Sequence, residues 1–157
     1  MRGRGGSIYL VRPDWDGDYE NMDQAVVEEY EWARHHLRVA PELWRLAGQD
    51  QRAADIKAII RCVYERDRCW MTSDEIERLL QLLDGLEEAL VGTVVDEHWM
   101  LRPEQLPKLR ARTKHLDLDD KRGELALDAV AEGISDVRSL RAILRDARDR
   151  GLLLSLD

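Results

Sequence analysis

Apolar residues recur at three- and four-residue steps through most of this chain, and this spacing constrains the fold more than any other feature. The clearest run begins at Thr72 and Glu75, which match the capping box that opens many helices. It predicts one long helix to about Leu101, with a buried stripe made of Ile76, Leu79, Leu80, Leu83, Leu86, Leu90, Val94 and Trp99. Because such a stripe must be covered by other apolar surfaces, we expect helix to pack on helix.

The same spacing and its breakers predict the helices before residue 72. One helix is expected over 19–39, where apolar residues lie on one side. Pro41 cannot donate a backbone hydrogen bond, so it is placed at the first position of a short helix, Pro41–Ala47, which Gly48 ends. Asp50 is then expected to cap a helix that continues to about Cys69.

The C-terminal third predicts further helices separated by proline and glycine. A short helix is expected over 104–115, between Pro103 and the segment after His115. Another begins at Asp119 or Asp120 and runs to about Glu132, and Gly133 is the expected residue just past its end. Ser135 would cap a last helix that ends at Gly151, with an inner side made of Val137, Leu140, Ile143, Leu144 and Ala147.

Two short segments at the ends of the chain favour extended structure instead. Residues 7–11 are β-like, and Leu152–Leu156 could pair with them as a small ribbon. The fold predicted for residues 1–157 is therefore a single all-α domain, a compact bundle of five main helices plus one or two short ones, with a possible terminal β-ribbon. Residues 1–6 are expected to be disordered or left over from cloning, and they are excluded from the fold argument.

Cysteine use and hydropathy bear on location. Cys62 and Cys69 lie in one predicted helix, where a rise of ~1.5 Å per residue separates them by about 10 Å, too far for a disulfide. Free thiols suit a reducing compartment. With no long apolar run and no apolar leader, the sequence predicts a cytoplasmic protein with no membrane association.

The net charge of −8 is unevenly distributed. Residues 14–31 hold eight acidic residues and no basic one, and residues 73–101 hold eight acidic residues and one arginine. Helix N-termini favour acids but do not account for Glu28, Glu29 and Glu31, which come later in the predicted helix. Either the chain's own basic segments, 34–68 and 108–114, neutralise these acids, or an external basic partner does.

Aromatic residues interleaved with the first acidic block indicate a protein-binding surface, because Trp and Tyr often anchor interfaces and acids speed capture of a basic partner. Trp15 lies in a polar loop and is the better anchor; Trp32 lies off the apolar stripe, and Tyr30 is expected in the core. The predicted partner-binding residues are Asp14, Trp15, Asp16, Asp18, Glu28, Glu29, Glu31 and Trp32.

Motifs for metal or catalytic chemistry are incomplete. The acids at 14, 16 and 18 resemble the start of a calcium loop, but Tyr19 and Ala25 replace its required Gly and Glu. Glu28 and Glu31 resemble the first Glu-x-x-Glu of helical nucleotide pyrophosphohydrolases, whose second motif should follow but here precedes it. We therefore predict no catalytic residue, no metal and no cofactor. A metal-dependent hydrolase of nucleotides using these carboxylates is the alternative.

Two other features are not expected to have a functional role. His35 and His36 are interpreted as a helix-surface pair. The last two predicted helices could form a helix-turn-helix, but the second mixes arginines with acids and the pI is about 5.1, so nucleic-acid binding is not expected.

In size, charge and helical plan the whole chain resembles bacterial immunity proteins, or antitoxins, although no motif carries the resemblance. The resemblance implies an inhibitor that neutralises a cognate toxin by covering its basic active-site or substrate groove. A non-catalytic regulatory or scaffold subunit would differ only in its partner. The sequence does not specify an oligomeric state.

Overall fold

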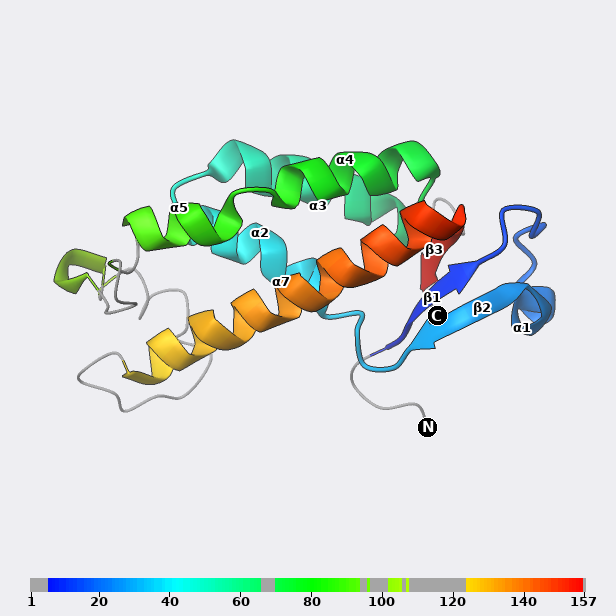
Figure 1. The fold of residues 1–157 in the computed structure, drawn as a ribbon, viewed down its shortest axis with the longest axis horizontal. Coiled ribbons are helices and arrows are strands. Elements are labelled where there is room, and N and C mark those ends of the chain that lie inside the picture. Colours follow the sequence, from blue (N-terminus) through cyan, green and yellow to red (C-terminus); the bar gives the residue numbers. More distant parts are fainter. Residues whose placement is uncertain are drawn as a thin grey trace.

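The computed structural model describes residues 6–65, 70–93, 96, 102–105, 107 and 124–156. These residues are mostly helical, with a small three-stranded antiparallel sheet at one end of the helices (Figure 1). The predicted helical fold is confirmed in outline, but the sheet means that all-α was an overstatement. The described elements are β1 (Ile8–Val11), η1 (Tyr19–Asn21), α1 (Met22–Ala25), β2 (Val26–Tyr30), α2 (His36–Leu46), α3 (Asp50–Tyr64), α4 (Ser73–Leu83), α5 (Leu86–Thr93), η2 (Pro103–Gln105), α7 (Glu124–Arg150) and β3 (Leu153–Leu156).

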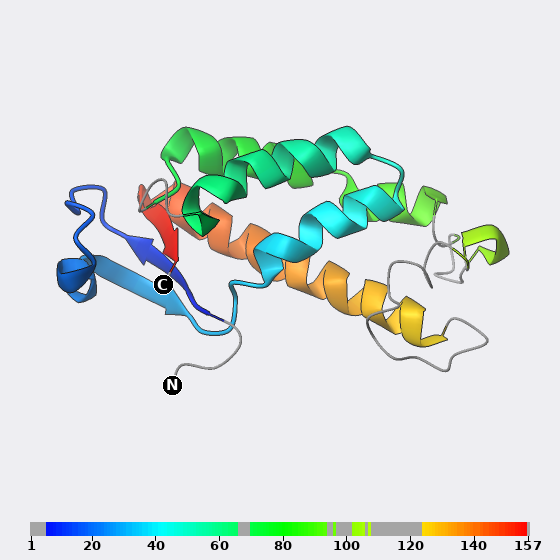
Figure 2. The ribbon, with the colours of Figure 1, turned by 180° about the vertical axis from the view of Figure 1, so that it is seen from behind.

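Helix α7 organises the molecule. It follows the long axis, with the other long helices along one side and the sheet beside its C-terminal end (Figures 1 and 2). Its inner side packs against α2 and α4. The apolar side predicted for the last helix is confirmed, since all five of its members are buried: Val137, Leu140, Ile143, Leu144 and Ala147.

The predicted break in this region is wrong, because α7 passes through Gly133 and Ser135 without interruption. There is accordingly no helix-turn-helix at this point. Gly133 serves a different purpose: a Cβ there would lie 3.1 Å from Val39 Cγ1 and 3.3 Å from Leu43 Cδ1 of α2. The missing side chain lets the two helices approach closely, which outweighs the helix-breaking tendency of glycine.

The long helix predicted after residue 72 is divided in two. Its start is confirmed, since Thr72 and Glu75 form the full capping box. Gly85, with φ of +81°, turns the chain between α4 and α5, and Arg52 holds the turn by donating to the Asp84 carbonyl oxygen at 2.9 Å. The stripe is buried across the break from Ile76 to Leu90, whereas its expected members Val94 and Trp99 lie outside the described residues.

The helix predicted over 19–39 is wrong. After the single turn of α1, residues Val26–Tyr30 form strand β2, which pairs with β1. Val26 and Tyr30 are spaced like one side of a helix, but β-branched Val26 and Val27 also suit a strand. The strand prevails because β1 supplies a partner ladder, including the pair Tyr9↔Glu29.

Boundaries of the next helices also differ from the prediction. Pro41 lies inside α2 and is buried in the core. The helix therefore lacks one backbone hydrogen bond at this position. The same helix buries Leu37, Leu43 and Trp44. Helix α3 begins at Asp50, with Gln49 rather than Asp50 at the cap position, and ends at Tyr64. The helix predicted over 104–115 falls mostly outside the described residues, as do residues 1–5 and Cys69. Of the helix predicted to end at Glu132, residues 124–132 are described and belong to α7.

The predicted terminal ribbon is confirmed and extended. Strand β1 is central, with β2 on one side and β3 on the other, and Ile8 lies opposite both Tyr30 and Leu156. The face with Ile8 and Leu10 joins the main helical core, whereas Tyr9 and Val11 belong to a smaller cluster with Trp15, Met22, Ala25 and Leu153. Beside β3, Met71 forms a single bridge to Leu154.

Candidate functional site

A groove of about 600 Å³ lies where the end of β2 and the connection to α2 face α7. Its lining combines acidic and apolar side chains: Glu29, Tyr30, Glu31, Ala33, His36, Ser139, Ala142 and Ile143. Two carboxylates therefore stand beside an apolar wall formed by α7. Such a groove suits a cationic side chain with an aliphatic stem.

A polar network fixes β2 against the end of α7. Tyr30 Oη donates to Asp146 Oδ2 at 3.0 Å. Arg150 donates to the same carboxylate oxygen at 3.1 Å and to Glu28 Oε1 at 3.0 Å. Burial, followed by the hydrogen bond to Asp146, raises the pKa of Tyr30. The network holds Glu28 and Tyr30 against the end of α7, while the neighbouring Glu29 accepts a hydrogen bond from Ser7 Oγ at 3.2 Å.

Of the predicted partner-binding residues, those at and after β2 divide into two kinds. Glu29 and Glu31 are exposed and line the groove, and Glu31 forms no ion pair with any described residue. Glu28 is instead neutralised by Arg150. Trp32, between two lining residues, is 55% exposed and has φ of +63°, a strained conformation for a bulky side chain.

The loop before α1 holds the other predicted residues. Asp14, Asp16 and Asp18 are exposed, and Asp14 pairs with Arg12 at 3.5 Å. Asp18 accepts from the backbone N–H of Glu20 and so begins η1. Trp15 is only 7% exposed, so the interpretation of Trp15 as an exposed anchor is wrong. A polar loop can still bury its Trp when the ring finds aromatic neighbours.

Those neighbours are Tyr19 and Trp70. The Trp15 ring centroid lies 5.6 Å from that of Tyr19 in an edge-on arrangement and 5.8 Å from that of Trp70. The indole N–H donates to the Asp18 carbonyl oxygen at 3.1 Å. Trp15 therefore supports the loop that presents the three aspartates.

The second acidic block is neutralised in part within the chain. Among the described residues its ion-pair partners are arginines of α7, whereas the basic segment 108–114 lies outside the described residues. The pairs are Glu87–Arg138, Asp84–Arg141 and Glu77–Arg148. The first is bidentate, with separations of 2.6 and 2.8 Å, and these hydrogen bonds lower the pKa of Glu87. This block therefore gives little support for an external partner.

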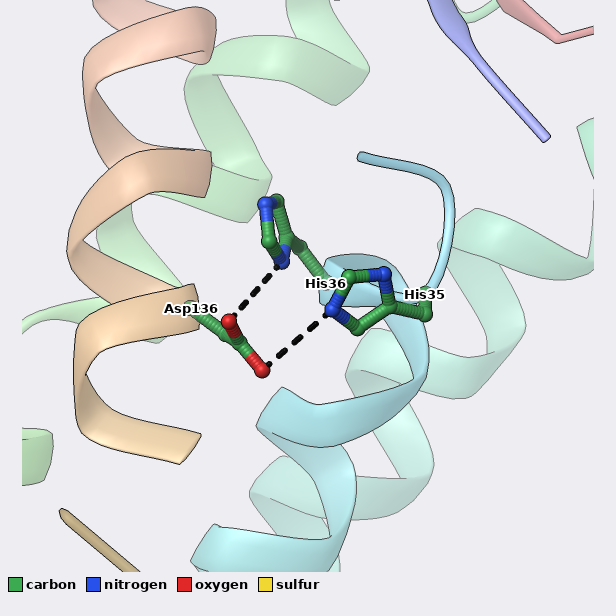
Figure 3. Close-up of side chains that lie close together, drawn as sticks. All are labelled: His35, His36 and Asp136. Atoms are coloured by element: carbon green, nitrogen blue, oxygen red, sulfur yellow. Dashed lines mark ion pairs between the residues drawn. The ribbon is translucent and has the colours of Figure 1, made fainter. Parts of the chain in front are cut away.

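Beside the groove, His35, His36 and Asp136 converge (Figure 3). His35 Nε2 lies 3.4 Å from Asp136 Oδ2, and His36 Nδ1 lies 3.4 Å from Asp136 Oδ1. Burial, together with neighbouring His35, lowers the pKa of His36, opposed by Asp136. The close α2–α7 approach at Gly133, one turn before Asp136, brings this carboxylate to the histidines.

Sequence reasoning missed this cluster. It interpreted His35 and His36 as a surface pair, and nothing local pointed to Asp136. A usable signal existed in Gly133-x-x-Asp136, since residues three apart share one side of a helix. That signal becomes meaningful only once α7 is known to run through Gly133 and to face α2.

The carboxylates at 28 and 31 do not form the helical metal motif. They belong to β2 and the connection after it, and Glu28 faces Arg150 while Glu31 lines the groove. The helical Glu-x-x-Glu motif on which the hydrolase alternative drew is therefore absent at these two positions.

Comparison with known proteins yields no relative for this chain. No family model, no curated protein and no solved structure matches it. Within the part of the chain that the structure describes, no helix combines the length and apolar character that a bilayer crossing requires.

Proposed function

We propose that this protein binds a basic protein along the open edge of β2 and in the adjacent groove, and that it acts in the cytoplasm as an inhibitor of a toxin. The observation that carries the proposal is the position of Glu29 and Glu31. Both are exposed, both line the groove, and they lie at an edge strand for which the described residues provide no second neighbour.

An open strand edge can accept an extended segment of a partner through backbone hydrogen bonds. Acidic side chains on that edge repel a second copy of the same strand and favour a basic segment. A partner Lys or Arg could then place its aliphatic stem against Ala142 and Ile143 and its charge between Glu29 and Glu31. Trp32, exposed at the end of the strand, offers an aromatic contact.

The remaining acidic residues would attract the partner before it binds. Asp14, Asp16 and Asp18 lie in the loop between β1 and η1, which is found at the α1 end of β2 (Figure 1), whereas Glu31 follows the other end of the strand. With a net charge of −8 on the chain, they would steer a basic surface toward the edge. A toxin that acts on nucleic acid has such a surface at its catalytic groove, and covering it would block the substrate.

The test compares the tagged wild-type chain with Glu29→Lys/Glu31→Lys in capture experiments from the native host. Glu88→Lys is the matched control, because Glu88 is equally acidic and exposed but lies on α5, away from the sheet. We expect a basic protein captured by the wild type and the control but not by the double variant. Expression of that protein should be toxic, and co-expression of the wild-type chain should relieve the toxicity.

Two results would refute the proposal. One is equal capture by the charge-reversed chain and the wild type. The other is a captured partner with no basic surface, whose association rate does not fall as salt rises.

A further inference from the structure

The side chains of His35, His36 and Asp136 come from the start of α2 and from α7 and lie close together, with both imidazoles facing the Asp136 carboxylate. His35 precedes α2, His36 is its first residue, and Asp136 lies on α7 (Figure 3). One ligand atom from each lies within 4.8 Å of the other two. The adjacent histidines face the same carboxylate through different nitrogens: Nε2 of His35 lies beside Asp136 Oδ2, and Nδ1 of His36 lies beside Asp136 Oδ1.

The separations suit two ligands of one ion better than two hydrogen bonds. Zinc bonds to nitrogen and carboxylate oxygen measure roughly 2.0–2.2 Å, so two ligands at a tetrahedral angle lie about 3.3–3.5 Å apart. Both nitrogen–oxygen separations are 3.4 Å, longer than the ~2.7–3.2 Å of a good N–H···O bond. His36 Nδ1 is fully buried and has no hydrogen-bond partner, although Asp136 lies beside it.

A simple ion pair explains this arrangement less well. It would need at least one charged imidazole, and both imidazoles face the single carboxylate of Asp136. The two imidazole ring centroids are 4.3 Å apart, so charging both rings would also bring like charges together. A neutral imidazole has a lone pair on one ring nitrogen, which is the form that binds metal.

We infer that His35, His36 and Asp136 bind one divalent transition-metal ion, with Zn²⁺ as the best match. Two imidazoles and one carboxylate suit zinc, whereas magnesium and calcium prefer oxygen ligands throughout. Three protein ligands leave a fourth position for water or for a group of a bound molecule. Because His36 also lines the groove, the ion would lie at its margin. The inference does not depend on the proposed protein partner.

The experiment titrates the metal-free, full-length chain with Zn²⁺ by calorimetry and by competition with a chromophoric chelator. We expect saturable binding of one ion per chain. His35→Ala and Asp136→Asn should each weaken binding by at least about tenfold, since even changes to outer-shell groups have effects of this size. The His35 side chain is half exposed, and Asp136→Asn preserves volume, so both variants should fold, as circular dichroism would verify.

Matched controls come from the other two histidines of the chain, His98 and His115. His98→Gln and His115→Gln should bind Zn²⁺ as the wild type does. Zinc should also raise the midpoint of thermal unfolding of the wild type but not of Asp136→Asn. Absence of saturable binding, or binding that survives both ligand variants, would overturn the inference.

Discussion

The substitution Gly133→Ala tests whether the absence of a side chain at this position allows α7 to pack closely against α2. Helix propensity alone favours alanine inside a helix by roughly 0.8–1 kcal/mol. The added Cβ would lie 3.1 Å from Val39 Cγ1 and 3.3 and 3.4 Å from the two Leu43 methyl carbons. Overpacking of this kind costs about 1–3 kcal/mol. The difference predicts that Gly133→Ala lowers the free energy of unfolding by up to about 2 kcal/mol.

A double-mutant cycle separates this explanation from the sequence prediction that Gly133 ends a helix. Val39→Ala removes the nearest contacting atom, so the cost of Gly133→Ala should fall by at least about 0.5 kcal/mol in that background. A glycine required for its backbone conformation would show no such rescue, because the strain would remain. Ser135→Ala, at an exposed position of the same helix, reports the propensity gain without a new contact.

The assay is urea unfolding followed by circular dichroism and Trp fluorescence, with free energies from linear extrapolation. The reasoning is refuted if Gly133→Ala stabilises the protein as much as propensity alone requires, or if Val39→Ala leaves its effect unchanged. Gly133→Ala should also weaken Zn²⁺ binding, because it moves Asp136 away from the histidines.

Further predictions concern the core, the network that fixes β2 and the α5–α7 ion pair. Leu140→Ala, at a fully buried position of α7, should cost about 2–5 kcal/mol in urea unfolding. Tyr30→Phe, which removes the bond to Asp146, should cost about 0.5–1.5 kcal/mol. Folding raises the pKa of Tyr30 from 10.0, so the stabilisation that the Tyr30 hydroxyl provides should be complete below pH 10 and lost as pH rises further. The free energy of unfolding, measured as a function of pH, should therefore fall less above pH 10 in Tyr30→Phe than in the wild type. Arg138 lowers the pKa of Glu87 from 4.5. The wild type should therefore have a higher free energy of unfolding than Glu87→Gln near neutral pH, and this difference should vanish as the pH falls below 4.5. A difference that persists in acid would contradict the pairing.

Some features could be predicted from the sequence because they depend on neighbours along the chain. The Thr72–Glu75 capping box needs only residues three apart, and the apolar sides of α4 and α7 follow from helical spacing. The terminal strands were also predicted, as a possible ribbon, from the short apolar run at each end of the chain. The cluster of acidic residues before and within β2 can be seen directly in the sequence.

Other features were decided by tertiary contacts. Val26–Tyr30 fits both a helix and a strand, and pairing with β1 selects the strand. Gly133 fits both a helix end and a helix crossing, and the presence of α2 selects the crossing. Trp15 lies in a polar loop, yet Tyr19 and Trp70 bury it. In each case the local pattern permits two outcomes, and the free energy of burial against a distant segment selects one.

The candidate site shows the same division most clearly. The sequence predicted a binding surface that includes Glu29, Glu31 and Trp32, and the structure adds the groove that Glu29 and Glu31 line. The sequence alone could not show that His35 and His36 lie beside Asp136, because Asp136 is distant from them along the chain. Their meeting depends on how closely α2 and α7 pack, and that distance is set by side-chain volumes on both helices rather than by any spacing within one of them.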